Sequence, residues 1–307
     1  MRPLPSRLAA VLQALLATFL WSTSFVLVKG GLREIPPLTF AGLRYGIAAV
    51  CLAPFALRGE VGRTLRRLTH RQWAELGLLG LLLYAVTQGA IFIGLQELPA
   101  VTVNLLLNLT SPLVAGLAIF TLGEKPTVLQ WAGIALFALG ALVCFYPPRL
   151  ADEAVGALAA VILGVAANAG SVVLGRGVTH QQSLHPLAIT AVSMAVGAGA
   201  LLVAGAALQG VPALEARHWA VVIWLAVVNT AFAFTIWDHT LRTLSAAESS
   251  ILNGTMLVQV AVLAWLFLNE RLTSRQGLGM VSAGAGAVVV AVQASGARPR
   301  GRGKARA

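Results

Sequence analysis

Residues 98–140 read LPAVTVNLLLNLTSPLVAGLAIFTLGEKPTVLQWAGIALFALG, and residues 244–286 read LSAAESSILNGTMLVQVAVLAWLFLNERLTSRQGLGMVSAGAG. The two stretches align without a gap, and the alignment places Glu124 opposite Glu270 and Gly133 opposite Gly279. Each copy consists of an apolar segment, a polar break around an acidic residue and its basic neighbour, and a second apolar segment. We therefore predict that the chain is built from two similar halves.

The composition is that of a membrane protein. Hydrophobic residues make up 58% of the chain, charged residues make up 11%, and the mean hydropathy is +0.82. A soluble domain carries about 25% charged residues, so this chain lacks the charge needed to cover a water-facing surface. The composition thus excludes an ordinary soluble protein.

Apolar runs of about 20 residues, enough to cross about 30 Å of hydrocarbon, fill the sequence almost from end to end. We expect ten membrane-spanning helices, at residues 8–28, 38–57, 73–95, 101–121, 128–146, 154–175, 186–208, 218–237, 246–268 and 276–294. The predicted fold is therefore all-α, with two five-helix repeats at residues 8–146 and 154–294 and a basic tail at residues 295–307. Short loops leave no room for a separate soluble domain.

The basic residues predict the orientation, because lysine and arginine accumulate in cytoplasmic loops. With the N-terminus inside, the outer loops carry only six basic residues, namely Lys29, Arg33, Arg149, Arg217, Arg271 and Arg275. Arg44 lies within a span, and the other 15 of the 22 basic residues face inward. Both termini are then cytoplasmic in an inner-membrane protein. Because each half has an odd number of spans, the second half must be inverted, which places a substrate site near the bilayer midplane.

The net charge of +11 does not indicate nucleic acid. The tail at 295–307 is most simply a topology anchor that contacts anionic lipid headgroups. Cys51 and Cys144 lie inside spans, where packing is a better interpretation than a disulfide or a metal site. The sequence has no glycine-rich phosphate loop, HExxH motif or ordered Ser-His-Asp set, so we expect neither an enzyme nor a bound cofactor. No span presents several carboxylates, which argues against a metal or cation carrier.

Polar residues inside the spans are the candidate substrate ligands, because an unpaired polar group in hydrocarbon is costly. In the fourth span Asn104, Asn108 and Ser111 lie on one helical face. Such a stripe suits a zwitterionic or neutral polar substrate, and the alternative is bonding between helices. Pro112 follows directly and should weaken the helix beside the stripe.

Further candidates are spread over both halves. They are Trp21 and Ser24 in the first span, Gln88 in the third, Asn168 in the sixth, Asn229 and Trp237 in the eighth, and Asn253 in the ninth. Trp21 has an alternative place in the aromatic belt at the membrane interface. The amides have the same alternative of bonding between helices.

Arg44 is the one basic residue well inside a span, roughly 9 Å deep at 1.5 Å per residue. Three interpretations remain open: it captures a substrate carboxylate, it extends to the outer interface, or it pairs with Glu34 or Glu97. Asp238 and His239 end the eighth span, where they would either carry a coupling proton or form a solvated helix end.

Several segments together resemble the EamA branch of the drug/metabolite transporter superfamily. They are Leu20–Phe25, Ile35–Phe40, Leu43–Tyr45, Ser111–Pro112, Gly123–Lys125, Met256–Gln259 and Leu263–Leu272. The resemblance implies a ten-helix, two-repeat carrier, and many such carriers export amino acids or other small metabolites. The halves differ in two places, since Pro112 aligns with Val258 and Arg44 aligns with Thr190 or Ser193. The two halves therefore should not do the same job.

Together these observations predict a membrane carrier that exports a small polar metabolite by alternating access. Uptake or facilitated diffusion is one alternative, and a membrane interaction or regulatory protein that has lost transport is another. The expected partners are a small-molecule substrate and the lipid bilayer, with a proton as a candidate coupling ion. The protein would work as a monomer or a homodimer.

Overall fold

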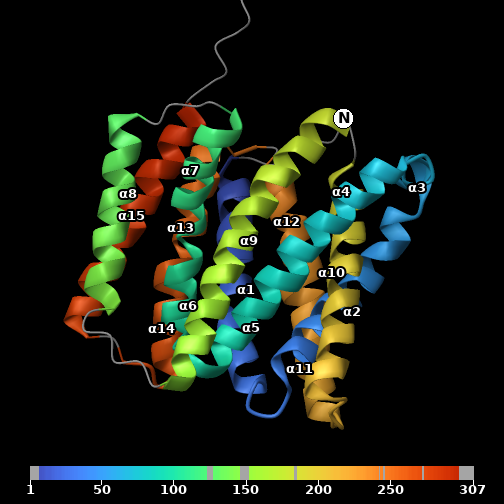
Figure 1. Ribbon diagram of the computed structural model, residues 1–307, viewed down its shortest axis with the longest axis horizontal. Coiled ribbons are helices and arrows are strands. Elements are labelled where there is room, and N and C mark those ends of the chain that lie inside the picture. The colour runs from blue at the N-terminus through green and yellow to red at the C-terminus, as the bar shows by residue number, and fades with distance from the viewer. Residues whose placement is uncertain are drawn as a thin grey trace, which may run out of the picture.

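The computed structural model describes residues 7–122, 127–145, 152–182, 185–241, 243–244, 246–271 and 273–296. All regular structure in these ranges is helical (Figure 1). Several residues named above lie outside the described residues, namely Gly123, Glu124, Lys125, Arg149, Leu272 and the tail from residue 297 onward.

The first half contains α1 (Arg7–Gly31), α2 (Pro37–Ala56), α3 (Gly59–Leu65), α4 (His70–Gly80), the π-helix η1 (Leu81–Thr87), α5 (Gln88–Glu97), α6 (Ala100–Leu107), α7 (Thr110–Leu122) and α8 (Val128–Phe145). The second half contains α9 (Asp152–Gln182), α10 (Pro186–Gln209), α11 (Ala216–Ala226), the π-helix η2 (Val227–Phe232), α12 (Ala233–Thr240), α13 (Ala246–Gly254), α14 (Met256–Leu268) and α15 (Ser274–Gly296). Elements α4–η1–α5 and α11–η2–α12 each form one continuous helical stretch.

Within the described residues, seven helical stretches are long and apolar enough to cross a membrane. Two shorter apolar helices, Ala100–Val114 and Val128–Cys144, correspond to the fourth and fifth expected spans, and α15 corresponds to the tenth. Large apolar side chains cover the outside of the bundle: Val50 is 72% exposed and Phe267 is 69% exposed. A water-facing surface rarely carries such extended apolar area, so this surface suits lipid.

The fourth expected span is interrupted where the proline was predicted to weaken it. A turn at Asn108 and Leu109 separates α6 from α7, and Pro112 has no N–H to donate to the carbonyl of Asn108 four residues earlier. The equivalent break in the second half separates α13 from α14 at Thr255, directly after Gly254 and without a proline. Both halves therefore interrupt the same helix at the same repeat position.

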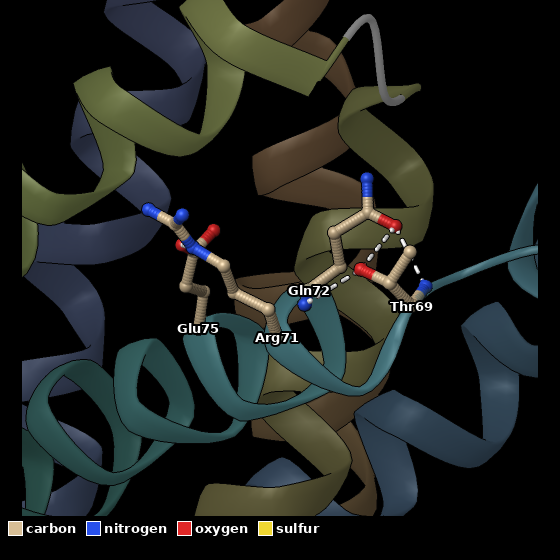
Figure 2. A network of polar contacts seen from close by, with 4 residues as sticks. All are labelled: Thr69, Arg71, Gln72 and Glu75. Atoms are coloured by element: carbon tan, nitrogen blue, oxygen red, sulfur yellow. Dashed lines mark hydrogen bonds and ion pairs between the residues drawn. The ribbon is translucent and has the colours of Figure 1, made fainter.

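The two halves also match in their helix starts. The offset that aligns Glu124 with Glu270 also aligns the starts of α4 with α11, η1 with η2, α6 with α13, α7 with α14 and α8 with α15. A capping box starts α4, where the backbone N–H of Thr69 donates to Gln72 Oε1 at 2.8 Å and that of Gln72 donates to Thr69 Oγ1 at 3.3 Å (Figure 2). In Figure 2 an ion pair between Arg71 and Glu75 flanks this box, with Nε and Oε1 2.9 Å apart.

Two further capping boxes explain a repeated sequence feature. The backbone N–H of Thr127 donates to Gln130 Oε1 at 2.8 Å, and that of Thr273 donates to Gln276 Oε1 at 2.9 Å. The aligned Thr-x-x-Gln segments of the two halves thus begin α8 and α15 by the same local chemistry.

The first helix of each half packs mainly against the other half. Helix α1 contacts α12, α13 and α14, whereas α9 contacts η1, α5 and α7. We call α1 with α11–α14 the α1 bundle, and α9 with α4–α7 the α9 bundle. The pairs α2–α10 and α8–α15 complete the molecule, with α8–α15 at one side and α2–α10 at the other (Figure 1).

Equivalent helices of the two halves pair in antiparallel fashion. In the α8–α15 pair, a Cβ at Gly140 would lie 2.5 Å from the carbonyl oxygen of Gly279, and one at Gly286 would lie 2.5 Å from that of Gly133. These glycines allow the backbones to touch. Helices α2 and α10 are also antiparallel, since Gly42 meets Leu202 and Gly205 meets Thr39. Antiparallel pairing of equivalent helices means that one half is turned over relative to the other.

The two bundles meet at one end of the molecule. We call it the Lys29 end; it is the lower end in Figure 1, where α1 finishes and α6 begins. There α6 packs against α14 and α1, and α5 packs against α1. The equivalent contacts at the opposite end, which would join α13 to α7 and α9, are at most slight within the described part of the chain.

Candidate substrate site

A cavity of about 370 Å³ lies between the two bundles. It is lined from α1, α2, η1, α5, α6, α7, α9, α12, α13 and α14, and so from both halves of the chain. The breaks between α6 and α7 and between α13 and α14 both reach it, through Asn108 and Thr110 on one side and Asn253 and Met256 on the other. The cavity is large enough for a small metabolite.

Most of the candidate residues meet at this cavity although they are far apart in the sequence. Those that line it are Trp21, Ser24, Arg44, Gln88, Asn104, Asn108, Asn168 and Asn253. Ser111 also lines it, so the polar stripe of the fourth span faces the cavity despite the turn within it. No acidic side chain is among the described residues that line the cavity.

Arg44 is held inside the protein. Its side chain is buried, with the residue 5% exposed, and does not extend to the interface. Its Nε donates to Thr230 Oγ1 at 2.9 Å and its Nη2 donates to Ser24 Oγ at 3.2 Å, while the guanidinium carbon lies 5.2 Å from the ring centre of Tyr45. Helix α2 therefore supplies a cation whose position is fixed by α1 and η2.

No described carboxylate forms an ion pair with Arg44. Glu34, one of the two suggested partners, instead accepts from Arg217 Nη2 at 2.8 Å and lies 2.6 Å from His218 Nε2. The hydrogen bond from His218, followed by the charge of Arg217, lowers the pKa of Glu34 against the opposing effect of desolvation. A buried guanidinium with five N–H donors and no acidic partner is a natural place for an anionic ligand group.

Trp21 belongs to an aromatic cluster at the cavity. Its ring centre lies 5.2 Å from that of Phe234 and 5.2 Å from that of Trp237, both in tilted arrangements. Its indole Nε1 is buried and has no hydrogen-bond partner. An orphaned donor of this kind is rare inside a protein and fits an acceptor supplied by a ligand. Packing against Phe234 and Trp237 places Trp21 inside the bundle, whereas the aromatic-belt alternative required contact with the membrane interface.

Asn104 and Asn168 line the cavity and bond to other helices at the same time, whereas Asn108 bonds within its own span. Asn104 Nδ2 donates to the carbonyl of Met256 at 3.3 Å, which joins α6 to α14. Asn108 Nδ2 donates to the carbonyl of Asn104 at 2.8 Å, and Asn168 Nδ2 donates to Thr110 Oγ1 at 3.1 Å. The two interpretations of these residues are therefore compatible, because an amide has further donor and acceptor positions.

Asn229 and Trp237 do not line the cavity. Asn229 is fully buried in η2, and its Nδ2 donates to Thr23 Oγ1 at 2.8 Å and to the carbonyl of Leu20. This is the hydrogen bonding between helices that was the alternative interpretation of this amide. Trp237 contributes indirectly, because its ring packs against Trp21.

Three residues outside the original candidate set complete the site. Tyr45 and Thr110 line the cavity, and Thr230 positions Arg44. Tyr45 follows Arg44 directly and Thr230 follows Asn229, but neither hydroxyl was distinguishable from ordinary helix polarity in the sequence. The described residues contain no group of three or more His, Cys, Asp or Glu side chains that could hold a metal ion.

Comparisons with known proteins agree with this architecture. The model of the EamA-like transporter family matches the chain twice, at residues 8–146 and 155–292. "Uncharacterized transporter YoaV" of Bacillus subtilis is 26% identical over 269 residues, which cover 85% of this chain and 89% of that protein. The "Probable amino-acid metabolite efflux pump" of Escherichia coli K12 is 27% identical over 278 residues, which cover 87% and 90%.

Another similar protein is described as "Uncharacterized inner membrane transporter YedA" of Escherichia coli K12. It is 28% identical over 243 residues, which cover 76% of this chain and 75% of that protein. A solved crystal structure has the same fold, with a TM-score of 0.67 over 93% of this chain and 98% of the other, at 20% identity.

Proposed function

Because the chain belongs to the EamA-like transporter family of the drug/metabolite transporter superfamily, we propose that it exports a small polar metabolite across the inner membrane by alternating access. Ten spans in two inverted five-helix repeats would carry out this movement. This count consists of the seven long apolar stretches, the broken helix α6–α7, and helices α8 and α15. The antiparallel pairing of α2 with α10 and of α8 with α15 supports the inversion.

The observation that carries the proposal is a cavity with an arginine and several amides in its lining, between two bundles that meet mainly at one end within the described residues. A carrier needs a central site that opens to one side of the membrane at a time, and inverted repeats place that site between the halves. Here the α1 bundle and the α9 bundle are in contact at the Lys29 end. The described chain thus corresponds to a state closed at that end.

The orientation follows from the charge distribution. Helix α1 begins and α15 finishes at the same end of the molecule (Figure 1). The basic segment 58–71 lies at that end with them, beyond α2. The cytoplasmic preference of basic residues supports an orientation with this end and both termini inside and the Lys29 end outside.

The cavity lining favours a zwitterion such as an amino acid or a related metabolite. Arg44 would bind a carboxylate, and Ser24 and the amides of Asn104, Asn108, Asn168 and Asn253 would bind the remaining polar groups. The rings of Trp21 and Phe234 would contact the apolar part. The printed name of the Escherichia coli amino-acid metabolite efflux pump supports this substrate class. A proton is the candidate coupling ion, and Asp238 and His239 in α12 are the candidate residues for it.

Flux measurements in proteoliposomes of known sidedness test the proposal. A panel of labelled amino acids and related metabolites is loaded inside or outside, and Arg44→Ala liposomes and protein-free liposomes serve as controls. We expect protein-dependent movement of at least one zwitterion, in the cytoplasm-to-exterior direction, that is saturable and lost in Arg44→Ala. Movement in the opposite direction alone would indicate uptake, and no movement of any compound would contradict the transport proposal.

A further inference from the structure

An ion pair of the α1 bundle lies at the Lys29 end, against the α9 bundle. Lys29 lies in the last turn of α1, and its Nζ is 3.5 Å from Oε1 of Glu270, which follows α14. Both residues belong to the α1 bundle. Their side chains are largely buried, with 24% of Lys29 and 15% of Glu270 exposed.

Both charges reach across to the α9 bundle, where α5 ends and α6 begins. Lys29 Nζ donates to the carbonyl oxygen of Leu98, the residue that closes α5. The backbone N–H of Ala100, the first residue of α6, donates to Glu270 Oε1 at 2.9 Å. Pro99 precedes α6 and provides no side-chain cap of its own, so Glu270 serves as the cap from the other bundle.

The arrangement is electrostatically matched to the helix ends. A helix C-terminus carries partial negative charge and attracts a cation, and a helix N-terminus carries partial positive charge and attracts an anion. Here the cation meets the C-terminus of α5 and the anion meets the N-terminus of α6. Exchanging the two charges would preserve the ion pair but would place each charge against a helix end of the same sign.

The local backbone explains how Glu270 reaches α6. Asn269 ends α14 in the left-handed conformation, with φ of 57°, which asparagine tolerates better than most residues. The N–H of Glu270 then donates to the carbonyl of Ala264 at 3.2 Å. This turn directs the carboxylate of Glu270 towards the start of α6.

The contact lies directly beyond the cavity. Val28, the neighbour of Lys29, and Leu95, one turn before Leu98, both line the cavity and are 1% exposed. A path from the cavity to the Lys29 end must therefore separate these contacts. The second carboxylate oxygen of Glu270, Oε2, is buried without a partner, so the contact does not satisfy this group completely. Such a contact can be released without the cost of breaking a fully satisfied network.

We infer that Lys29 and Glu270 form the outer gate of the carrier, a latch that closes the cavity by clamping the junction of α5 and α6. The latch rests on the proposed function for its role, since only a carrier needs to open and close this end. Substrate release to the exterior requires Lys29 to leave Leu98 and Glu270 to leave Ala100. Weakening either contact should shift the protein towards an outward-open state.

Thiol labelling from outside tests the latch without requiring transport. The native cysteines Cys51 and Cys144 are replaced by serine, Asn108→Cys is introduced in the cavity, and spheroplasts receive an anionic, membrane-impermeant thiol reagent. We expect Lys29→Met and Glu270→Gln each to raise the labelling rate roughly tenfold or more, the effect of losing a charge-assisted hydrogen bond. Glu34→Gln is the matched control, because it removes an exposed carboxylate ion pair at the same end and should leave the rate unchanged.

The two variants change charge in opposite directions, which separates gating from simple steering of the reagent. Steering would slow labelling in Lys29→Met and speed it in Glu270→Gln, whereas opening the gate speeds it in both. The double variant Lys29→Glu with Glu270→Lys should be labelled as fast as the single variants, because each charge then lies against a helix end of the same sign. Unchanged rates in both single variants, rates that move in opposite directions, or a wild-type rate in the double variant would overturn the latch.

A variant that does not fold is recognised because it is not monodisperse in detergent, and it is left out. The labelling rates of the remaining variants then test the latch. The labelling result is also independent of the flux result. If labelling rises as expected while no compound moves in proteoliposomes, the latch is supported and the transport proposal fails. If compounds move but labelling does not change, the latch fails and transport stands.

Discussion

Arg44 shows most directly how burial turns one side chain into a candidate ligand. A buried guanidinium is costly unless its donors are satisfied, and among the described residues those of Arg44 reach only hydroxyl and carbonyl oxygens. The sequence predicted its depth, because the spacing within the second span gives the distance from the helix start. It could not predict the partners, because Ser24 and Thr230 come from elements far away in the chain.

Substitutions of Arg44 separate a planar contact from a simple charge. Arg44→Lys should weaken substrate affinity along with Arg44→Ala, because a point charge cannot reproduce a two-pronged contact to a carboxylate. The expected loss is about 1.5–3 kcal/mol, or roughly tenfold to over a hundredfold. The measurement is substrate affinity at matched expression, with Arg217→Lys as the control at an exposed site. Near-wild-type affinity in both Arg44 variants would remove this residue from the site.

Asn104 and Asn229 offer a matched comparison of two buried amides. Asn229→Ala should lower the stability by about 0.6 kcal/mol and at most about 1.7 kcal/mol, the range for hydrogen bonds between membrane helices, and should leave substrate affinity nearly unchanged. Asn104→Ala should reduce affinity, because this side chain lines the cavity. Thermal unfolding in detergent and substrate titration check the two effects. A larger affinity loss in Asn229→Ala than in Asn104→Ala would reverse the assignment.

At the scale of helices, the sequence predicted much of what the structure shows. Apolar length predicted the helices, of which seven stretches in the described residues are long enough to span a membrane, and Pro112 predicted a weak point where α6 and α7 are separated. The π-helices η1 and η2 were not predicted, because an extra residue per turn leaves no mark in hydropathy. Their equal positions in the two halves show that this irregularity belongs to the repeat. Thr230, which positions Arg44, lies within η2, so the irregular turn contributes to the site.

The α8–α15 pair depends on backbone contact at its glycines. A side chain at Gly140 would place Cβ 2.4 Å from the backbone nitrogen of Ala283, and no flexible group can move aside. Gly140→Leu should therefore separate the helices and destabilise the protein by about 1–3 kcal/mol or more. Gly277→Ala in the same pair is the control, because no atom lies within 4 Å of the added carbon. Equal melting temperatures for the two variants would disprove tight packing at Gly140.

For the whole molecule, the orientation in the membrane remains a prediction from charge. Reporter fusions after Ala307 and within the loop at residues 58–71 should both read as cytoplasmic, because the basic residues concentrate on that side. Replacing Arg63, Arg66 and Arg67 together by neutral residues should weaken this preference. An external reading at either fusion site in the native chain would contradict the ten-span arrangement and the outward assignment of the Lys29 end.

The sequence could predict the existence of a site between the halves but not its full membership. Inverted repeats imply a shared central cavity, and most of the polar residues inside the spans reach it. Asn229 does not, because hydrophobic spacing indicates depth and face but not which neighbour a face meets. Each half places its first helix, α1 or α9, in a bundle with helices of the other half, and this arrangement determines which helices become neighbours. Only contacts between distant segments reveal the arrangement.

A shared site makes a prediction about both halves at once. Asn108 of the first half and Asn253 of the second line the same cavity, each beside the break in its helix. If the bundles move about a common site, substrate should change the thiol reactivity of Asn108→Cys and Asn253→Cys together, because both positions face the water that enters the open state. A cysteine at Val50, which is 72% exposed on the outer surface of α2, is the control and should not respond. Labelling rates measured with and without a transported substrate check the coupling. Reactivity at the two cavity positions that ignores every transported compound would mean that the halves do not alternate around this cavity, and the breaks after α6 and α13 would then be structural features of the repeat alone.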